Sequence, residues 1–151
     1  MIQSYINTPI TLLTNDSPVA FQTDDVRTNS TKNCNQCGWL CHTEGNPLYK
    51  ITKGGLYHVE FTANVSSATA GVLALGVFLD GIQVADAIET IGAAGDYANL
   101  SIDKEVAVCQ GGTLTIEAIP NVVNPTDLTG DALDTETPII ISANLRIERD
   151  C

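Results

Sequence analysis

Basic residues are scarce in this chain, and long apolar runs are absent. Lys and Arg number 7 against 18 acidic residues, which gives the 151 residues a net charge of −11. Nucleic acids and anionic membrane surfaces attract basic proteins, so this charge argues against both as partners. The longest mainly apolar stretch, residues 71–79, is far shorter than the roughly 20 residues of a membrane-spanning helix. The sequence therefore predicts partners that are neither nucleic acid nor membrane.

Signatures of catalysis and of export are also missing. The two histidines are His42 and His58, and neither has the spacing from Ser and Asp that would make it the base of a nucleophile. We therefore expect no catalytic residue, no cofactor and no enzymatic activity. The first five residues lack the basic start and the apolar run of a signal peptide. This favours a protein that stays in the compartment where it is made.

What the sequence does contain is an alternation of apolar and polar residues with a period of two. The segments that show it are residues 57–63, 72–79, 100–108, 113–118 and 139–148. This period indicates strands with one buried face, and turn formers such as Asp80-Gly81 separate them. Helical character is thin, although residues 84–91 would allow one turn of helix. About eight to ten short strands predict an all-β fold, an antiparallel sandwich or jelly roll.

Two of these features make sharper predictions. The expected core residues are Phe21, Tyr57, Val59 and Phe61. The segment Val72 to Leu79 is apolar on both faces, whereas an antiparallel sandwich strand normally wets one face. Such a strand is either covered by another element of the chain or lies at a subunit contact. Both explanations remain open at this point.

The most conspicuous chemical cluster is Cys34, Cys37, Cys41 and His42. Three thiols and an imidazole match a Cys₃His zinc site in composition, but adjacent residues cannot easily both point at one ion. Disulfide pairing and free thiols are the other two readings, and the five cysteines leave at least one thiol free or paired between chains. We expect no metal at this cluster. Residues 120–138 predict one long acidic loop, either solvated or a calcium ligand set.

One motif carries a resemblance to a known family. Residues 54–61, GGLYHVEF, resemble the G-x-Y-x-V/F strand of the trimeric jelly rolls related to tumour necrosis factor and the complement globular head. The flanking order fits, with Pro18 to Phe21 as the first core strand, Trp39 in an irregular connection and Leu48 to Ile51 as a short strand. The last apolar segment, 139–147, would return beside the first strand.

The resemblance implies a tumour necrosis factor-like homotrimer used for structure or attachment. Residues 18–151 would form the jelly roll, and residues 1–17 an N-terminal arm or anchoring strand. In a trimer, the outward side chains His58, Glu60 and Thr62 would form the subunit interface. The chain is also similar to small bacteriophage head-fibre and capsid-decoration proteins. This branch implies a place on the virion, other capsid proteins as partners and contact with a host surface glycan or receptor. The alternative is a bacterial carbohydrate-binding or adhesion module.

Overall fold

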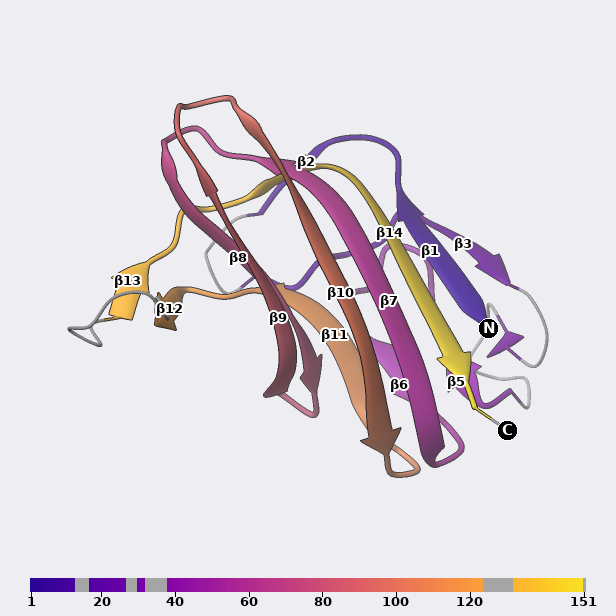
Figure 1. The fold of residues 1–151 in the computed structure, drawn as a ribbon. Coiled ribbons are helices and arrows are strands. Elements are labelled where there is room, and N and C mark those ends of the chain that lie inside the picture. Colours follow the sequence, from indigo (N-terminus) through magenta and orange to yellow (C-terminus); the bar gives the residue numbers. More distant parts are fainter. Residues whose placement is uncertain (13–16, 27–29, 32–37, 124–131, 151) are drawn as a thin grey trace.

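Two six-stranded sheets pack face to face in the computed structural model, which describes residues 1–12, 17–26, 30–31, 38–123 and 132–150 (Figure 1). The strands are β1 (Ile2–Ile6), β2 (Ile10–Thr11), β3 (Thr23–Val26), β4 (Ser30–Thr31), β5 (Leu40–Cys41), β6 (Tyr49–Ile51), β7 (Gly55–Ser66), β8 (Gly71–Leu79), β9 (Ile82–Ile91), β10 (Tyr97–Val108), β11 (Thr113–Ala118), β12 (Asn121–Val123), β13 (Ala132–Asp134) and β14 (Ile139–Arg149). The described residues contain no helix long and apolar enough to cross a membrane.

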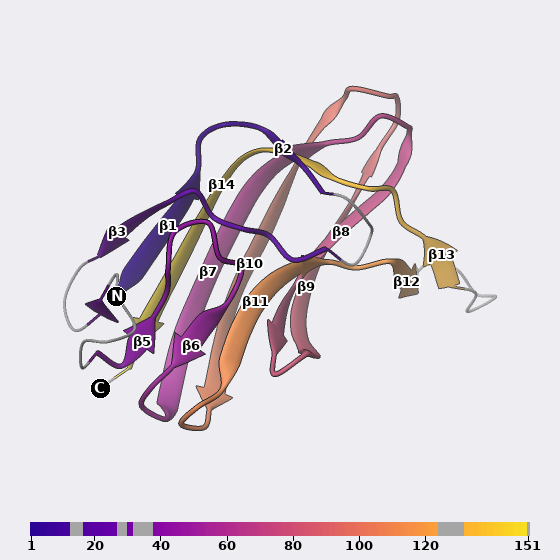
Figure 2. The same ribbon diagram turned by 180° about the vertical axis from the view of Figure 1, so that it is seen from behind.

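The strand order confirms an antiparallel jelly roll. The first sheet runs β10–β7–β14–β1–β3, with β2 paired to the start of β14, and the second runs β4–β5–β6–β11–β8–β9 (Figure 2). Strands that follow one another in sequence often lie in opposite sheets, so the chain crosses the sandwich repeatedly. All the pairings between these strands are antiparallel except that of β4 with β5.

The core fills the space between the two sheets. The structure places Phe21, Tyr57, Val59 and Phe61 there, each with 0% of its surface exposed. The ring of Phe21 meets the ring of Phe61 edge to face, with 6.4 Å between centroids. Edge-to-face contact is a favoured geometry for aromatic pairs, because the positive ring edge faces the negative ring surface. The alternation in residues 57–63 therefore places each side chain on the expected face.

The N-terminal strand β1 is part of the first sheet. Strand β1 lies inside the first sheet, paired with β14 on one side and β3 on the other, and Ile2 and Ile6 are completely buried. Strand β2 pairs with this chain's own β14. Val19 and Phe21 are buried as expected but lie outside the named strands. Strand β14 returns beside β1, not beside residues 18–21.

Residues 84–91 form part of strand β9, not a turn of helix. This strand pairs only with β8 in its sheet and lies at the sheet's edge, so most of its side chains are exposed and its alternation is blurred. The hairpin predicted at Asp80-Gly81 is confirmed, since Leu79 pairs with Ile82. Both turn residues have positive φ, 51° and 78°, as a two-residue turn of this hand requires.

The outward face of β8 is covered by the chain itself. Strands β12 and β13 form a hairpin where one acidic loop was expected, and Val122 and Leu133 from this hairpin join Ile119 in packing on β8. Their contacts on β8 include Ala74 and Phe78. The doubly apolar character of this strand is thus explained by an intramolecular cover and no longer indicates a subunit contact. Asp127 and Asp131, two acidic residues of the expected loop that could have been calcium ligands, lie outside the described residues.

Candidate functional surface on the outer face of the first sheet

The outer face of the first sheet carries a continuous polar surface on its three neighbouring strands β10, β7 and β14. The outward side chains are Asn99, Ser101, Asp103 and Glu105 on β10; His58, Glu60, Thr62 and Asn64 on β7; and Ser142, Asn144, Arg146 and Glu148 on β14. Alternation along each strand turns these residues away from the core. We call these twelve residues the outer polar face. It includes the three residues expected at the subunit interface.

Amides and hydroxyls form one half of this face. Asn64 donates through Nδ2 to Ser142 Oγ at 3.0 Å, and its Oδ1 accepts from Asn99 Nδ2 at 3.0 Å. Thr62 and Asn144 border the same groove, whose volume is about 210 Å³. This half offers hydrogen-bond donors and acceptors of both kinds, without a formal charge among these five residues.

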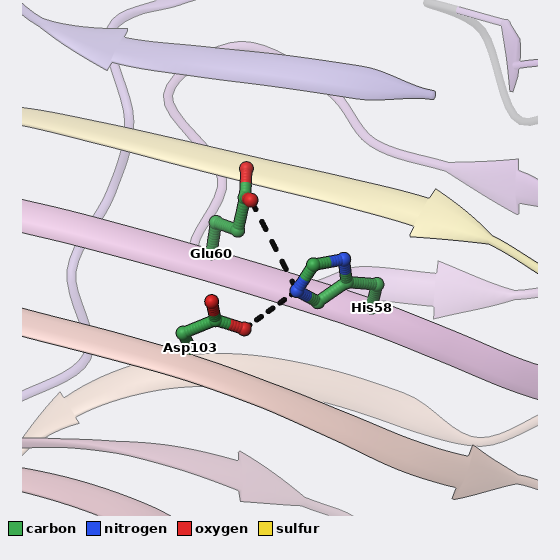
Figure 3. Close-up of side chains that lie close together, drawn as sticks. All are labelled: His58, Glu60 and Asp103. Atoms are coloured by element: carbon green, nitrogen blue, oxygen red, sulfur yellow. Dashed lines mark hydrogen bonds and ion pairs between the residues drawn. The ribbon is translucent and has the colours of Figure 1, made fainter.

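Charged groups form the other half, where His58, Glu60 and Asp103 converge (Figure 3). His58 Nε2 lies 2.6 Å from Asp103 Oδ1 and 4.0 Å from Glu60 Oε1. The second oxygen of Glu60 accepts from Arg146 Nη1 at 3.0 Å, and Arg146 Nη2 donates to Glu148 at 2.5 Å. His58, Glu60 and Asp103 all lie within reach of one small cation, since their ligand atoms are within 4.8 Å of one another.

The hydrogen bond to Asp103 raises the pKa of His58 above its ordinary value of 6.5, and the nearby charges of Asp103 and Glu60 act in the same direction. The hydrogen bond to Glu60 likewise raises the pKa of the Arg146 guanidinium. Both shifts have one origin, because a carboxylate that accepts a hydrogen bond from a cation favours its charged form. This end of the outer polar face therefore holds alternating positive and negative groups.

The cysteine-rich segment is only partly described. Cys34 and Cys37 lie outside the described residues, and Cys41 is disulfide-bonded. His42 is completely buried, stacked on Tyr49 with 3.8 Å between ring centroids. Its Nδ1 lies 2.6 Å from Asp24 Oδ2 and its Nε2 lies 2.6 Å from the carbonyl oxygen of Asn46. Because a carbonyl oxygen only accepts, Nε2 carries a proton, and both ring nitrogens are already engaged.

Ser4, Asp24 and His42 meet in space, and no sequence pattern predicts this contact. Ser4 Oγ donates to Asp24 Oδ1 at 2.5 Å, so the hydroxyl is bonded to the acid and not to the imidazole. In a catalytic triad the base accepts the proton of the nucleophile, which this arrangement does not provide. All three residues are buried, and the cluster is therefore a polar connection between strands β1 and β3 and the segment before β6.

Two members of the charged half were missed by sequence reasoning. Asp103 is 45 residues from His58, and Arg146 is 86 residues from Glu60. They meet because Asp103 and Arg146 both stand opposite Glu60 in the strand register. A signal existed in the alternation of each strand, which turns Asp103 outward, but the pairing partner depends on the fold.

Solved structures provide the comparison with known proteins. The chain matches the globular domain of zebrafish complement 1qA protein (TM-score 0.60, 14% identity), with 99% of this chain and 98% of that chain covered. It also matches Eiger TNF from S. frugiperda (TM-score 0.60, 6% identity; 99% and 93% covered) and murine APRIL (TM-score 0.54, 11% identity; 96% and 98% covered).

No protein-family model matches the chain, and no curated protein matches its sequence. The structural matches run over nearly the whole length of both partners, but their sequence identities of 6–14% are low. A likeness at this level concerns the backbone and its strand order. The chain thus has a jelly-roll fold similar to those of the complement 1qA globular domain, Eiger TNF and APRIL.

Proposed function

We propose that the chain is a non-enzymatic, homotrimeric structural or ligand-binding domain that associates through the outer polar face. The observation that carries this proposal is the full jelly-roll strand order, which supports the resemblance to trimeric jelly rolls found in the sequence. The exposure of the outward faces of the two sheets favours the first sheet as the subunit contact. The outward face of β8 in the second sheet is already covered, whereas Thr62, Asn64 and Ser101 on the first are exposed.

Light scattering behind a sizing column tests the assembly. We expect a mass of roughly three times the 16.0 kDa chain at micromolar concentration. A clean monomer would contradict the proposal.

The variant Glu60→Lys locates the contact. It brings three new cations together near a three-fold axis, so we expect smaller species with unchanged strand content by circular dichroism. Glu89→Lys makes the same charge change on the exposed edge strand β9, and this control should remain trimeric. If both variants stay trimeric, the outer polar face is not the contact.

We further propose that this trimer is a component of a bacteriophage particle, as a head fibre or capsid decoration. Its partners would then be other capsid proteins and a host surface glycan or receptor. The general resemblance of the chain to small phage jelly rolls, together with its high Asn and Thr usage, motivates this role. Capsid, portal or tail genes beside its own gene, and the protein itself in purified particles by mass spectrometry, are the expected results. A gene among chromosomal housekeeping neighbours would contradict the virion role.

A bacterial carbohydrate-binding module is the second candidate. One observation favours it: the groove beside Asn64, Asn99 and Asn144 offers amides, and Tyr97 on the same face of β10 is 72% exposed. Sugars are held by amide hydrogen bonds together with an aromatic ring that stacks on their apolar face. A glycan array should then show binding that Asn64→Ala and Tyr97→Ala each reduce. Equal binding by both variants and the parent chain would exclude this groove.

A further inference from the structure

We propose that His58, Glu60 and Asp103 bind one divalent transition-metal ion, of which Zn²⁺ is the best fit, on the outer polar face. The three residues offer one imidazole nitrogen and two carboxylate oxygens from two neighbouring strands (Figure 3). Zn²⁺ accepts this ligand set and takes three protein ligands where a fourth position stays open. Sequence reasoning found no metal site here, because the third ligand comes from a different strand.

The side chains of His58, Glu60 and Asp103 need to move only a little to hold a zinc ion. Ligand atoms around a tetrahedral zinc ion lie about 3.4 Å apart, since each sits roughly 2.0–2.2 Å from the metal. His58 Nε2 is 2.6 Å from Asp103 Oδ1 and 4.0 Å from Glu60 Oε1. The first pair opens and the second closes by less than about 1 Å, which side-chain rotation alone provides. The side chain of Asp103, 74% exposed, has room for that rotation.

The backbone supports the site more firmly than a surface loop would. His58 and Glu60 are two residues apart on the same face of β7, and Asp103 stands directly opposite Glu60 on β10. Arg146 holds the other oxygen of Glu60 at 3.0 Å, so Oε1 remains turned toward His58. Hydrogen bonds of this kind to a ligating carboxylate orient the ligand and strengthen metal binding.

The charges around the site attract a cation. Glu105 and Glu148 both stand opposite His58 in the strand register, on the two sides of β7. With Glu60 and Asp103 they make four carboxylates against the one guanidinium of Arg146. A mixed set with an imidazole favours Zn²⁺ over Mg²⁺ and Ca²⁺, which prefer oxygen ligands alone.

The test follows the imidazole signals of the full chain by NMR during a titration with Zn²⁺. The chain has two histidines, and His42 is buried with both nitrogens engaged, so it serves as an internal control. We expect the His58 signals to move until one Zn²⁺ per chain is bound, while the His42 signals stay in place. Mg²⁺ in the same titration should move neither.

Two variants test whether the ion binds at these three residues. Asp103→Asn keeps a hydrogen-bond acceptor for His58 but is a poorer ligand, so Zn²⁺ affinity should fall by about 10-fold or more. Glu89→Gln removes the same charge from β9 and should leave the affinity unchanged. His58 signals that do not move in a several-fold molar excess of Zn²⁺ would overturn the proposal. Equal affinities of Asp103→Asn and the parent chain would overturn it too, because the ion would then be bound elsewhere, for instance by thiols.

The proposed metal site and the proposed subunit contact share the outer polar face, but two separate measurements distinguish them. Zn²⁺ binding at His58 is measured per chain, and the mass by light scattering is recorded in parallel with and without the ion. A monomer that binds Zn²⁺ contradicts the trimer and leaves the metal site standing. A trimer whose His58 signals do not respond to Zn²⁺ contradicts the metal site and leaves the assembly proposal standing.

Discussion

Phe61 contributes a large aromatic side chain to the core between the two sheets. It lies at the centre of β7, completely buried, and meets the ring of Phe21. Phe61→Ala should lower the free energy of unfolding by about 3–5 kcal/mol, since the lost transfer energy adds to that of a cavity. Thermal denaturation followed by circular dichroism checks this. Thr90→Ala, at an exposed position of the edge strand β9, should shift the free energy by no more than about 0.5 kcal/mol.

The raised pKa of His58 makes the stability of the folded chain depend on pH. Its pKa is raised in the folded chain, chiefly by the hydrogen bond to Asp103, so the protonated ring favours folding. That contribution is fully present below the unfolded pKa near 6.5 and is lost as pH rises through the folded value. An NMR titration should place the His58 midpoint above 6.5, and Asp103→Asn should bring it down. An identical midpoint in that variant would contradict the assigned cause.

For single residues, the sequence pattern predicted which face of the sheet a side chain points to, but not which residues it contacts. The alternation in residues 57–63 was enough to assign Phe61 inward and Glu60 outward, because the strand period is two. It could not show that Asp103 stands beside His58, because strand register joins residues that no local pattern links. The buried meeting of Ser4, Asp24 and His42 was missed for the same reason.

The β12–β13 hairpin covers the outward face of strand β8. Val122 is 6% exposed there, packed with Ile119 and Ala74. Val122→Asp would bury a charge, so we expect the hairpin to detach and expose apolar surface while the sandwich remains folded. Increased binding of a hydrophobic dye with retained strand content is the expected signal. Thr90→Asp, at an exposed position of β9, should bind no more dye than the parent chain.

Two strands show no clean alternation of apolar and polar residues in the sequence. Strand β9 lies at an edge and has one ladder partner, so its side chains show no clean alternation and its apolar spacing admits a helical turn. Strand β1 is short, and the polar Ser4 occupies an inward position, which hides the pattern of Ile2 and Ile6. Val19 and Phe21 were assigned to a strand by the family resemblance, and they are buried but lie outside the named strands. The long segments β7 and β14 were predictable, since their alternation runs over many residues.

For the whole molecule, charge opposes assembly. Each chain has a net charge of −11, so three chains bring together −33. Screening weakens this repulsion, because the Debye length falls from about 30 Å at 0.01 M salt to about 8 Å at 0.15 M. We therefore expect the trimer to tighten as salt rises over this range, measured as light-scattering mass against dilution. Association that weakens with salt would instead indicate that ion pairs dominate the contact.

The position of β14 in the first sheet has a consequence for the order of folding during synthesis. The last strand of the chain lies between β7 and β1, so until it leaves the ribosome the first sheet consists of two separate pairs, β10 with β7 and β1 with β3. The pairing of β1 is incomplete until Ile147, the partner of Ile2 on β14, has been synthesised. Contacts of such sequence separation are slow to form, and unpaired strand edges promote aggregation. A nascent or truncated chain that lacks β14 would thus have all the remaining strands of the sandwich, and its first sheet would still be divided into two pairs.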